Sequence, residues 1–176
     1  MRRISKTIVE EDKIGIVINR RKTVRGIILD ENKILLVYSK KFDDYMFPGG
    51  GLSKGERKIN ALKRELLEEL GCRDVEIIKP FGYIKEKRYS AKTHVPFIQK
   101  SYYYLCMISD IGEQKLESYE VDFGVSPTWI DIDEAIRHDS IVVKDKEHQK
   151  KGIRTVLHRE IKVLEKIKEM IKHEKI

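Results

Sequence analysis

The sequence predicts an α+β fold in which a mixed β-sheet lies between helices, an α/β/α sandwich. Strand-like segments rich in Val, Ile and Tyr surround one helix-like segment, and a second, longer helix-like segment ends the chain. No internal repeat, low-complexity linker or shift in composition divides the 176 residues. Because a chain of this length can bury a sizeable core, we expect residues 1–176 to form a single domain.

Two strands are predicted over residues 23–29 and 33–38, with a turn at Asp30-Glu31-Asn32 between them. A further pair of strands is predicted upstream, over residues 4–9 and 13–18.

One helix is predicted over residues 56–70, where apolar residues recur at gaps of three or four positions: Ile59, Leu62, Leu66 and Leu70. At about 100° per residue, this stripe covers roughly 80° of the helix surface. Three glutamates are centred roughly 115° from the middle of the stripe. The helix can therefore bury its leucines while the glutamates face a cleft.

Longer strands are predicted over residues 75–85 and 97–108. The second contains three consecutive tyrosines, so alternation directs Tyr103 to one face and Tyr102 and Tyr104 to the other. We expect these rings to pack in the core; stacking of one face on a nucleobase is the alternative.

The last two helices follow another strand, which ends at Trp129 and Ile130. Asp131 or Asp133 would cap a short helix through Ile136. A long helix is expected over about residues 147–172, and it offers a surface for a homodimer. Its apolar stripe consists of Ile153, Leu157, Ile161, Leu164, Ile167 and Ile171.

Composition limits the classes of partner. The net charge is +7, from 36 Lys and Arg against 29 Asp and Glu, and a basic surface attracts nucleotides and RNA. Much of the excess lies in the Lys-rich ends and the C-terminal segment, where a solvated helix face explains it. No aromatic and basic motif typical of RNA recognition accompanies it. Nucleic acid is therefore a partner that the charge permits but does not favour.

The compartment is predicted to be the cytoplasm, with no membrane partner. No apolar run approaches the roughly 20 residues of a membrane helix. The basic N-terminus lacks the apolar stretch of a secretory signal. Two cysteines, Cys72 and Cys106, do not form a disulfide framework or a zinc cluster.

Three carboxylates at the end of the central helix indicate a metal site. Glu65, Glu68 and Glu69 have the spacing i, i+3, i+4 and precede Gly71, a residue type that commonly ends a helix. The helix dipole places partial negative charge at that end. A hard divalent cation with oxygen ligands would balance the cluster.

A glycine-rich loop precedes this helix, in the sequence Phe47-Pro48-Gly49-Gly50-Gly51. Such a loop brings main-chain groups close to phosphate or metal, where a side chain would collide. We expect Gly49, Gly50 and Gly51 to contact substrate, although an isolated loop of this type is more often a simple turn.

The segment 50–72 resembles the signature box of the Nudix family: Gly, five residues, Glu, seven residues, Arg-Glu, an aliphatic residue, any residue, Glu-Glu, any residue, Gly and an aliphatic residue. The matching positions are Gly50, Glu56, Arg64, Glu65, Leu66, Glu68, Glu69 and Gly71. Cys72 replaces the final aliphatic residue, and a buried Cys behaves as a small hydrophobe.

The resemblance implies the same α/β/α architecture and metal-dependent hydrolysis of a phosphoanhydride in a nucleoside diphosphate linked to another moiety X. Mg²⁺ would be the ion, with Mn²⁺ as a substitute. Glu68 and Glu69 are the first choice as ligands, and Glu65 is either a third ligand or the base that activates water. In the family, a carbonyl from the glycine pair often completes the metal shell, here from Gly49 or Gly50.

Three further residues receive roles by the same comparison. Arg64 is within pairing range of Glu68 and is expected to orient the glutamates. Glu56 is either structural or a ligand of a second ion. Many relatives use an extra acid from a late loop as base or ligand, and Glu120 is our choice there over Glu117 and Asp122.

Two other functions remain open. One is an RNA 5′-end pyrophosphohydrolase, which the basic balance suggests. The other is a sensor that binds a nucleotide without hydrolysing it, although such modules often lose box glutamates that this chain retains. The identity of X is not specified by the box.

Overall fold

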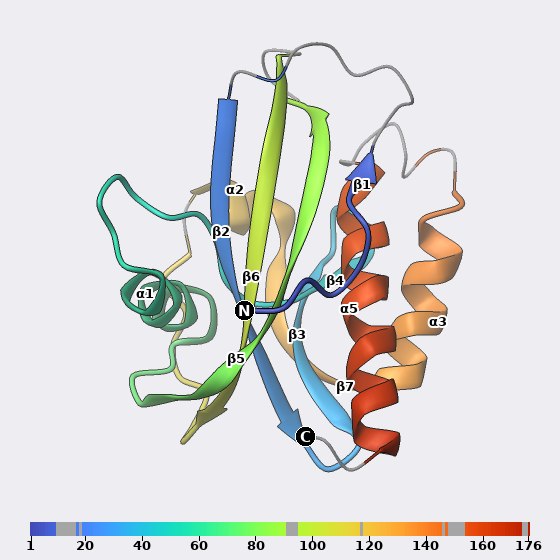
Figure 1. Cartoon of the computed structure of the whole chain (residues 1–176). Coiled ribbons are helices and arrows are strands. Elements are labelled where there is room, and N and C mark those ends of the chain that lie inside the picture. Colours follow the sequence, from blue (N-terminus) through green and yellow to red (C-terminus); the bar gives the residue numbers. More distant parts are fainter. Residues whose placement is uncertain are drawn as a thin grey trace.

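The computed structural model describes residues 1–9, 17, 19–90, 95–116, 118–145, 147, 154–173 and 176. A curled mixed β-sheet lies between α1 (Lys58–Leu70) on one side and α3 (Ile132–Val142) and α5 (Arg154–Lys172) on the other (Figure 1). This arrangement confirms the predicted α+β fold. Among the described helices, none is both long enough and apolar enough to cross a bilayer.

Within the part of the chain that the structure describes, seven strands form the sheet in the order β1-β5-β6-β2-β3-β4, and β7 also pairs with β3. Strand β6 pairs with β2 in parallel and with β5 in antiparallel orientation. A short helix, α2 (Ser118–Phe123), precedes β7. The strands are β1 (Ile8–Val9), β2 (Asn19–Asp30), β3 (Lys33–Ser39), β4 (Asp44–Met46), β5 (Val75–Tyr89), β6 (Pro96–Ile108) and β7 (Val125–Asp131).

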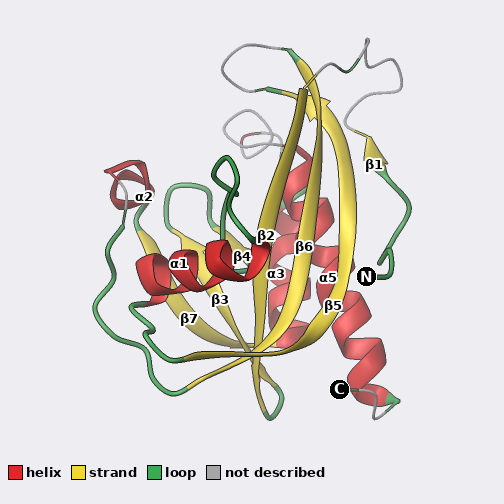
Figure 2. Ribbon diagram, turned by 60° about the vertical axis from the view of Figure 1, so that its left-hand side comes forward, coloured by secondary structure: helices red, strands yellow, loops and turns green. Residues whose placement is uncertain are grey.

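The sheet opens between β2 and β3, and the glycine-rich loop occupies the opening. β2 pairs with β3 only next to their hairpin. Further along the same edge of β2, the Gly26 N–H donates to the Pro48 carbonyl over 2.9 Å. The Val24 N–H donates to the Gly50 carbonyl, also over 2.9 Å. Main-chain bonds therefore attach the loop to the sheet beside α1 (Figure 2).

Two apolar clusters fill the two sides of the sheet, and the tyrosines of β6 divide between them as alternation predicts. Tyr103 belongs to the cluster beneath α3 and α5, whereas Tyr102 and Tyr104 belong to the cluster beneath α1. All three are buried, which confirms core packing. Leu62, Leu66 and Leu70 of α1 are fully buried in their cluster, as expected.

One member of the predicted stripe of α1 is placed differently. Ile59 is 37% exposed, because it lies in the first turn, and Ala61 and Leu62 make the first buried contacts. Assigning Ile59 to the buried stripe was therefore wrong. The helix begins at Lys58, after Arg57 as N-cap, and ends at Gly71, whose φ of 66° is the left-handed conformation that glycine readily adopts.

The structure confirms Asp131 as the cap of α3, since its carboxylate accepts from the N–H groups of Asp133 and Glu134. The helix continues to Val142 instead of ending at Ile136, because Asp139 and Val142 extend its buried face beyond Ile136.

Several other elements begin or end at residues that differ from the prediction. β5 runs four residues further than residue 85, to Tyr89, whereas the strand predicted over residues 4–9 is limited to β1 (Ile8–Val9). The elements α2 and β4 did not appear in the sequence pattern. The predicted strand over 13–18 lies almost entirely outside the described residues, as does the start of the C-terminal helix with Ile153. Leu157, Ile161, Leu164 and Ile167 of that helix's stripe are buried as predicted, and Ile171 is partly buried against the same side of the sheet.

Candidate active site

The acidic end of α1, the glycine-rich loop and α2 surround one cavity of about 410 Å³. The predicted site residues that line it are Glu65, Glu68, Glu69, Glu120, Arg64, Gly49, Gly50 and Gly51. Its other lining residues are Arg21, Arg25, Val37, Met46, Phe47, Leu52, Ser53, Phe123 and Val125. Residues distant in sequence therefore meet at one concave surface, which is the usual form of a small-molecule site.

Glu69 is bound to the glycine loop. Its Oε2 accepts the Gly49 N–H over 2.6 Å, and the residue is only 8% exposed. Burial raises the pKa of the Glu69 carboxyl to about 8, although the Arg25 charge and the Gly49 hydrogen bond act in the opposite direction. A carboxylate so poorly solvated gains much from a nearby cation.

Glu65 lies against the main chain of Gly50. A β-carbon at Gly50 would come within 2.3 Å of Glu65 Oε2, so only glycine allows this approach. Burial raises the pKa of the Glu65 carboxyl, while Arg64 lowers it. The Gly50 carbonyl accepts from Val24 and keeps a second lone pair for another partner.

Arg64 forms hydrogen bonds with three of the glutamates, Glu56, Glu65 and Glu68. Its Nη1 donates to Glu65 Oε1 over 2.8 Å and to Glu68 Oε2 over 3.0 Å. Its Nε and Nη2 grip both oxygens of Glu56 over 3.1 and 3.2 Å, and Nη2 also donates to the Gly51 carbonyl. The planar guanidinium suits such forked contacts. The arrangement agrees with an orienting role for Arg64.

Glu56 is bound to Arg64 and to the Ser53 N–H, and it is not among the residues that line the cavity. Hydrogen bonding by Arg64 lowers the pKa of Glu56. This position favours the structural alternative for Glu56 over the alternative in which it holds a second ion.

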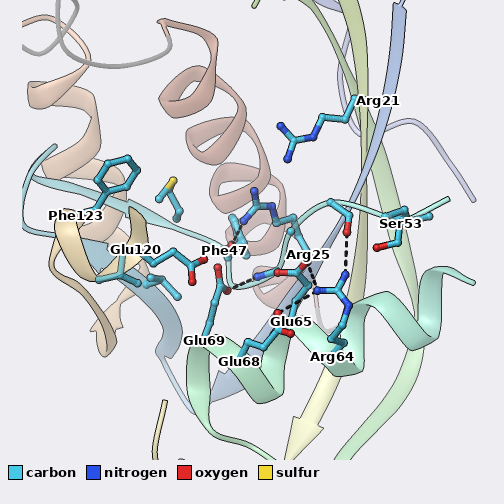
Figure 3. Close-up of a pocket in the computed structure, with 17 residues that line it drawn as sticks. Arg21, Arg25, Phe47, Ser53, Arg64, Glu65, Glu68, Glu69, Glu120 and Phe123 are labelled. Carbon is cyan, nitrogen blue, oxygen red and sulfur yellow. Dashed lines mark hydrogen bonds and ion pairs between the residues drawn. The ribbon is translucent and has the colours of Figure 1, made fainter. Parts of the chain in front are cut away.

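Glu120 reaches the cavity from α2 and is 8% exposed. Figure 3 shows the side chains of Glu120 and Glu69 pointing toward one another. The Glu120 charge contributes to the raised pKa of Glu69. Of its competitors, Asp122 is exposed and does not line the cavity, and Glu117 lies outside the described residues.

Sequence reasoning missed two arginines and an apolar wall. Arg21 and Arg25 extend from β2 into the cavity from the side opposite α1 (Figure 3). Arg21 and Arg25 are four positions apart on β2, so strand alternation places both side chains on the same face. This spacing was a usable signal that one face carries two cations. The apolar wall consists of Val37, Met46, Phe123 and Val125.

The donor set suits a hard divalent cation, which prefers carboxylate and carbonyl oxygens. Within the described residues, no three His, Cys, Asp or Glu side chains converge on a single point in metal-binding geometry. The reason lies in the contacts above: Arg64 holds Glu65 and Glu68, and the Gly49 N–H holds Glu69. Four carboxyl groups nevertheless line the same cavity beside the Gly50 main chain, so the residues fit such an ion.

Comparison with known proteins agrees with this site. The NUDIX domain model matches residues 19–153. An RNA pyrophosphohydrolase of a Sulfurovum species is 33% identical over 94 residues, which are 51% of this chain and 60% of that protein. The RNA pyrophosphohydrolase of a Nitratiruptor species is 31% identical over 119 residues, 59% of this chain and 74% of that protein.

A solved structure described as a NUDIX hydrolase from Nitrosomonas europaea shares the fold, with a TM-score of 0.53 and 24% identity. The superposition covers 75% of this chain and 85% of that one. The fold, the carboxylate-lined cavity and the family match thus define a protein of the Nudix class. The chain belongs to the NUDIX domain family, whose members generally use divalent metal ions.

Proposed function

We propose that the chain is a pyrophosphohydrolase that cleaves a phosphoanhydride bond in a nucleoside diphosphate linked to another moiety X. Mg²⁺ is the proposed ion, and Mn²⁺ is the proposed substitute. The observation that carries the proposal is the meeting of Glu65, Glu68, Glu69 and Glu120 with the glycine main chain around one cavity. The family match adds support, because the box that supplies three of these acids lies within it.

The ion would be held by Glu68 and Glu69, with the Gly50 carbonyl as a further ligand, and Glu65 would be the third carboxylate ligand if Glu120 is the base. When bound, it supplies charge neutralisation at the phosphates and lowers the pKa of a bound water. Glu120 or Glu65 would take the proton of the attacking water as the phosphoanhydride P–O bond breaks. The leaving phosphate carries away the bonding electron pair.

The remaining walls of the cavity favour a ligand with a phosphate end and an apolar end. Arg21 and Arg25 place two cations opposite the acids, where they can bind phosphate oxygens. Phe123 and Met46 belong to the apolar wall, which is suited to a base or another flat group.

A panel of substrates tests the proposal: nucleoside triphosphates, oxidised nucleotides, ADP-ribose, dinucleoside polyphosphates, nucleotide sugars and capped RNA, each with Mg²⁺ or Mn²⁺ and with products identified. Cleavage of a phosphoanhydride that Glu68→Gln abolishes supports it. Tight binding of a nucleotide without cleavage would instead support a sensor.

A second candidate substrate is the 5′ end of RNA. A groove of about 250 Å³ shares Arg21 with the cavity, and Arg20, Phe97 and Val95 also line it. A cationic and aromatic groove next to the phosphate site suits the following nucleotides of a single strand. Two similar proteins are described as RNA pyrophosphohydrolases. Cleavage of triphosphorylated RNA in preference to free nucleotides, with a steep loss of activity in salt, would favour this candidate.

A further inference from the structure

The buried side chain of Glu160 and the half-buried side chain of Arg25 hold the backbone of Phe47 from two sides. Its N–H donates to Glu160 Oε2 over 3.1 Å, and its carbonyl accepts from Arg25 Nη1 over 2.8 Å. Its ring is fully buried and meets Tyr103 edge-on, with centroids 5.4 Å apart. Phe47 is therefore a fixed point directly before Pro48 and the glycine loop.

Glu160 belongs to α5, on the other side of the sheet from α1, and it is itself held in place. Arg159 Nε donates to Glu160 Oε1 over 2.7 Å, and Arg159 Nη1 donates to Glu86 Oε2 over 2.7 Å. Gln99 of β6 donates to the same Glu86 oxygen over 3.2 Å. All four side chains are at most 2% exposed. The network joins α5, β5 and β6.

Packing alone does not explain a buried ion network. Burying charges carries a desolvation penalty that their attraction repays only in good geometry, and apolar side chains of similar volume often stabilise a fold as well or better. Glu160 follows Leu157 by three positions and precedes Leu164 by four, so it lies within the apolar stripe of α5. A leucine there would leave the Phe47 N–H without its acceptor. The main-chain bond is thus the specific contribution of Glu160.

The loop has little room to absorb a shift at Phe47. Two residues later, Gly49 donates to Glu69 over 2.6 Å. A β-carbon at Gly49 would lie 2.2 Å from the Val24 carbonyl oxygen, so this backbone is pressed against β2. Movement of Phe47 would therefore be transmitted to the Gly49 N–H and the Glu65 contact at Gly50.

We propose that Glu160 is a positioning residue, which fixes the Phe47 backbone and thereby aims Gly49 and Gly50 at the carboxylates of α1. The expected effect of Glu160 on kcat rests on the proposed function, whereas its expected effect on the backbone of Phe47 and Gly49 does not. An experiment that measures both hydrogen exchange and kcat distinguishes a failure of this proposal from a failure of the proposed function.

The test compares wild type, Glu160→Gln and the control Glu165→Gln, a change in an exposed ion pair with Lys162 on the same helix. A glutamine has one acceptor oxygen where Glu160 uses two, so the Nε and Nη2 donors of Arg159 compete with the Phe47 N–H for it and the Phe47 bond is weakened. Hydrogen exchange of the Phe47 and Gly49 amides should be faster by about tenfold in Glu160→Gln. The amide of Leu36 in β3 should exchange at the wild-type rate.

The kinetic readout is a fall of about tenfold in kcat for phosphoanhydride cleavage, with KM changed by less than about twofold. Glu165→Gln should behave as wild type in every measurement. Wild-type exchange at Phe47 and Gly49 in Glu160→Gln would overturn the proposal, even if kcat fell. Equal acceleration at Leu36 would also overturn it, because the effect would then be global unfolding.

If Glu160→Gln does not fold, Arg159→Lys provides the same test. A lysine cannot reproduce the forked contact with Glu160 and Glu86, so Glu160 keeps its charge but loses its fixed position. The amides of Phe47 and Gly49 should again exchange faster, and unchanged exchange would contradict the proposal. If the wild type cleaves no substrate, the proposed function fails, while faster exchange of the two amides would still support positioning by Glu160.

Discussion

The backbone N–H of Gly49 donates to Oε2 of Glu69 over 2.6 Å. This bond joins the glycine loop to the acidic end of α1, two segments that meet beside the opening between β2 and β3. Gly49 and Glu69 both line the cavity, so the bond between them lies where a ligand would contact both the main chain of the loop and the acids of α1. Each element around the cavity can therefore be tested by one substitution.

Gly50→Ala should disable the site without unfolding the protein. Its β-carbon would fall 2.3 Å from Glu65 Oε2, so the carboxylate must move. A displacement of about 1 Å in an active site can cost about 100-fold in rate. We expect a loss of that order in kcat/KM with Mg²⁺, measured on the substrate that the panel identifies.

Gly55→Ala is the matched control for Gly50→Ala. Nothing lies within 4 Å of its β-carbon, but its φ of 80° disfavours alanine. It should lower stability by about 1 kcal/mol and leave kcat/KM near the wild-type value. Equal activities of the two variants would show that the contact between Gly50 and Glu65 is irrelevant to catalysis.

Arg64→Lys should weaken the response to metal. A lysine keeps the charge but cannot grip Glu56 through two oxygens while also contacting Glu65 and Glu68. Loss of such orienting contacts typically costs about 10–100-fold in metal affinity or activity. The Mg²⁺ concentration for half-maximal activity should rise accordingly, and an unchanged titration would argue against an orienting role.

Arg21→Ala should raise KM more than it lowers kcat. Arg21 lines the cavity opposite the acids and lies beside Gly51, so it is placed to bind phosphate. We expect a rise of about tenfold in KM. Arg137→Ala, in an exposed pair with Glu134 on α3, is the control. A loss confined to kcat would place Arg21 in the chemical step.

Stability should fall as pH rises from about 5 to 8. Burial raises the pKa of Asp139 to about 8 and that of Asp44 to about 7, and Glu160 adds to both shifts. The unfolded chain loses these protons near pH 3.9. Between these values the folded state binds more protons, so the stabilisation present at low pH is lost as pH passes through 7 and 8.

Asp139→Asn isolates this effect. The asparagine can still accept the Tyr45 N–H that Asp139 binds over 3.1 Å. The variant should be more stable than wild type at pH 8 by at least about 1 kcal/mol, and close to it at pH 5. Urea unfolding at both values measures the difference, with the exposed Asp74→Asn as control. A wild-type midpoint that rises from pH 5 to 8 would refute the assignment.

The sequence pattern predicted which acids line the cavity better than it predicted the other walls. Glu65, Glu68 and Glu69 follow from helical spacing, and Glu120 was chosen from its place before the last strand. Alternation along β2 could have shown that Arg21 and Arg25 share a face, but not that this face meets the acids of α1. Phe123 was missed because it reaches the cavity from α2, a helix that the sequence pattern did not predict. Ile59 was misplaced because periodicity does not show where a helix leaves the sheet.

Glu160 illustrates a signal that was present but unused. A charged residue within an apolar stripe must either reach solvent or find a buried partner. Its partners are the Phe47 N–H and Arg159, the first more than a hundred positions away in sequence, so tertiary structure was needed to identify them. The split of Tyr103 from Tyr102 and Tyr104, in contrast, required only strand alternation.

The most direct test of the central claim is Mg²⁺-dependent product release by wild type, Glu68→Gln and Glu69→Gln on the substrate panel. We predict cleavage of a phosphoanhydride by the wild type and a loss of at least about 100-fold in each variant, with folding retained. Glu165→Gln should match the wild type. Unchanged, Mg²⁺-dependent release by Glu68→Gln and Glu69→Gln would contradict the metal assignment and, with it, the account of this site.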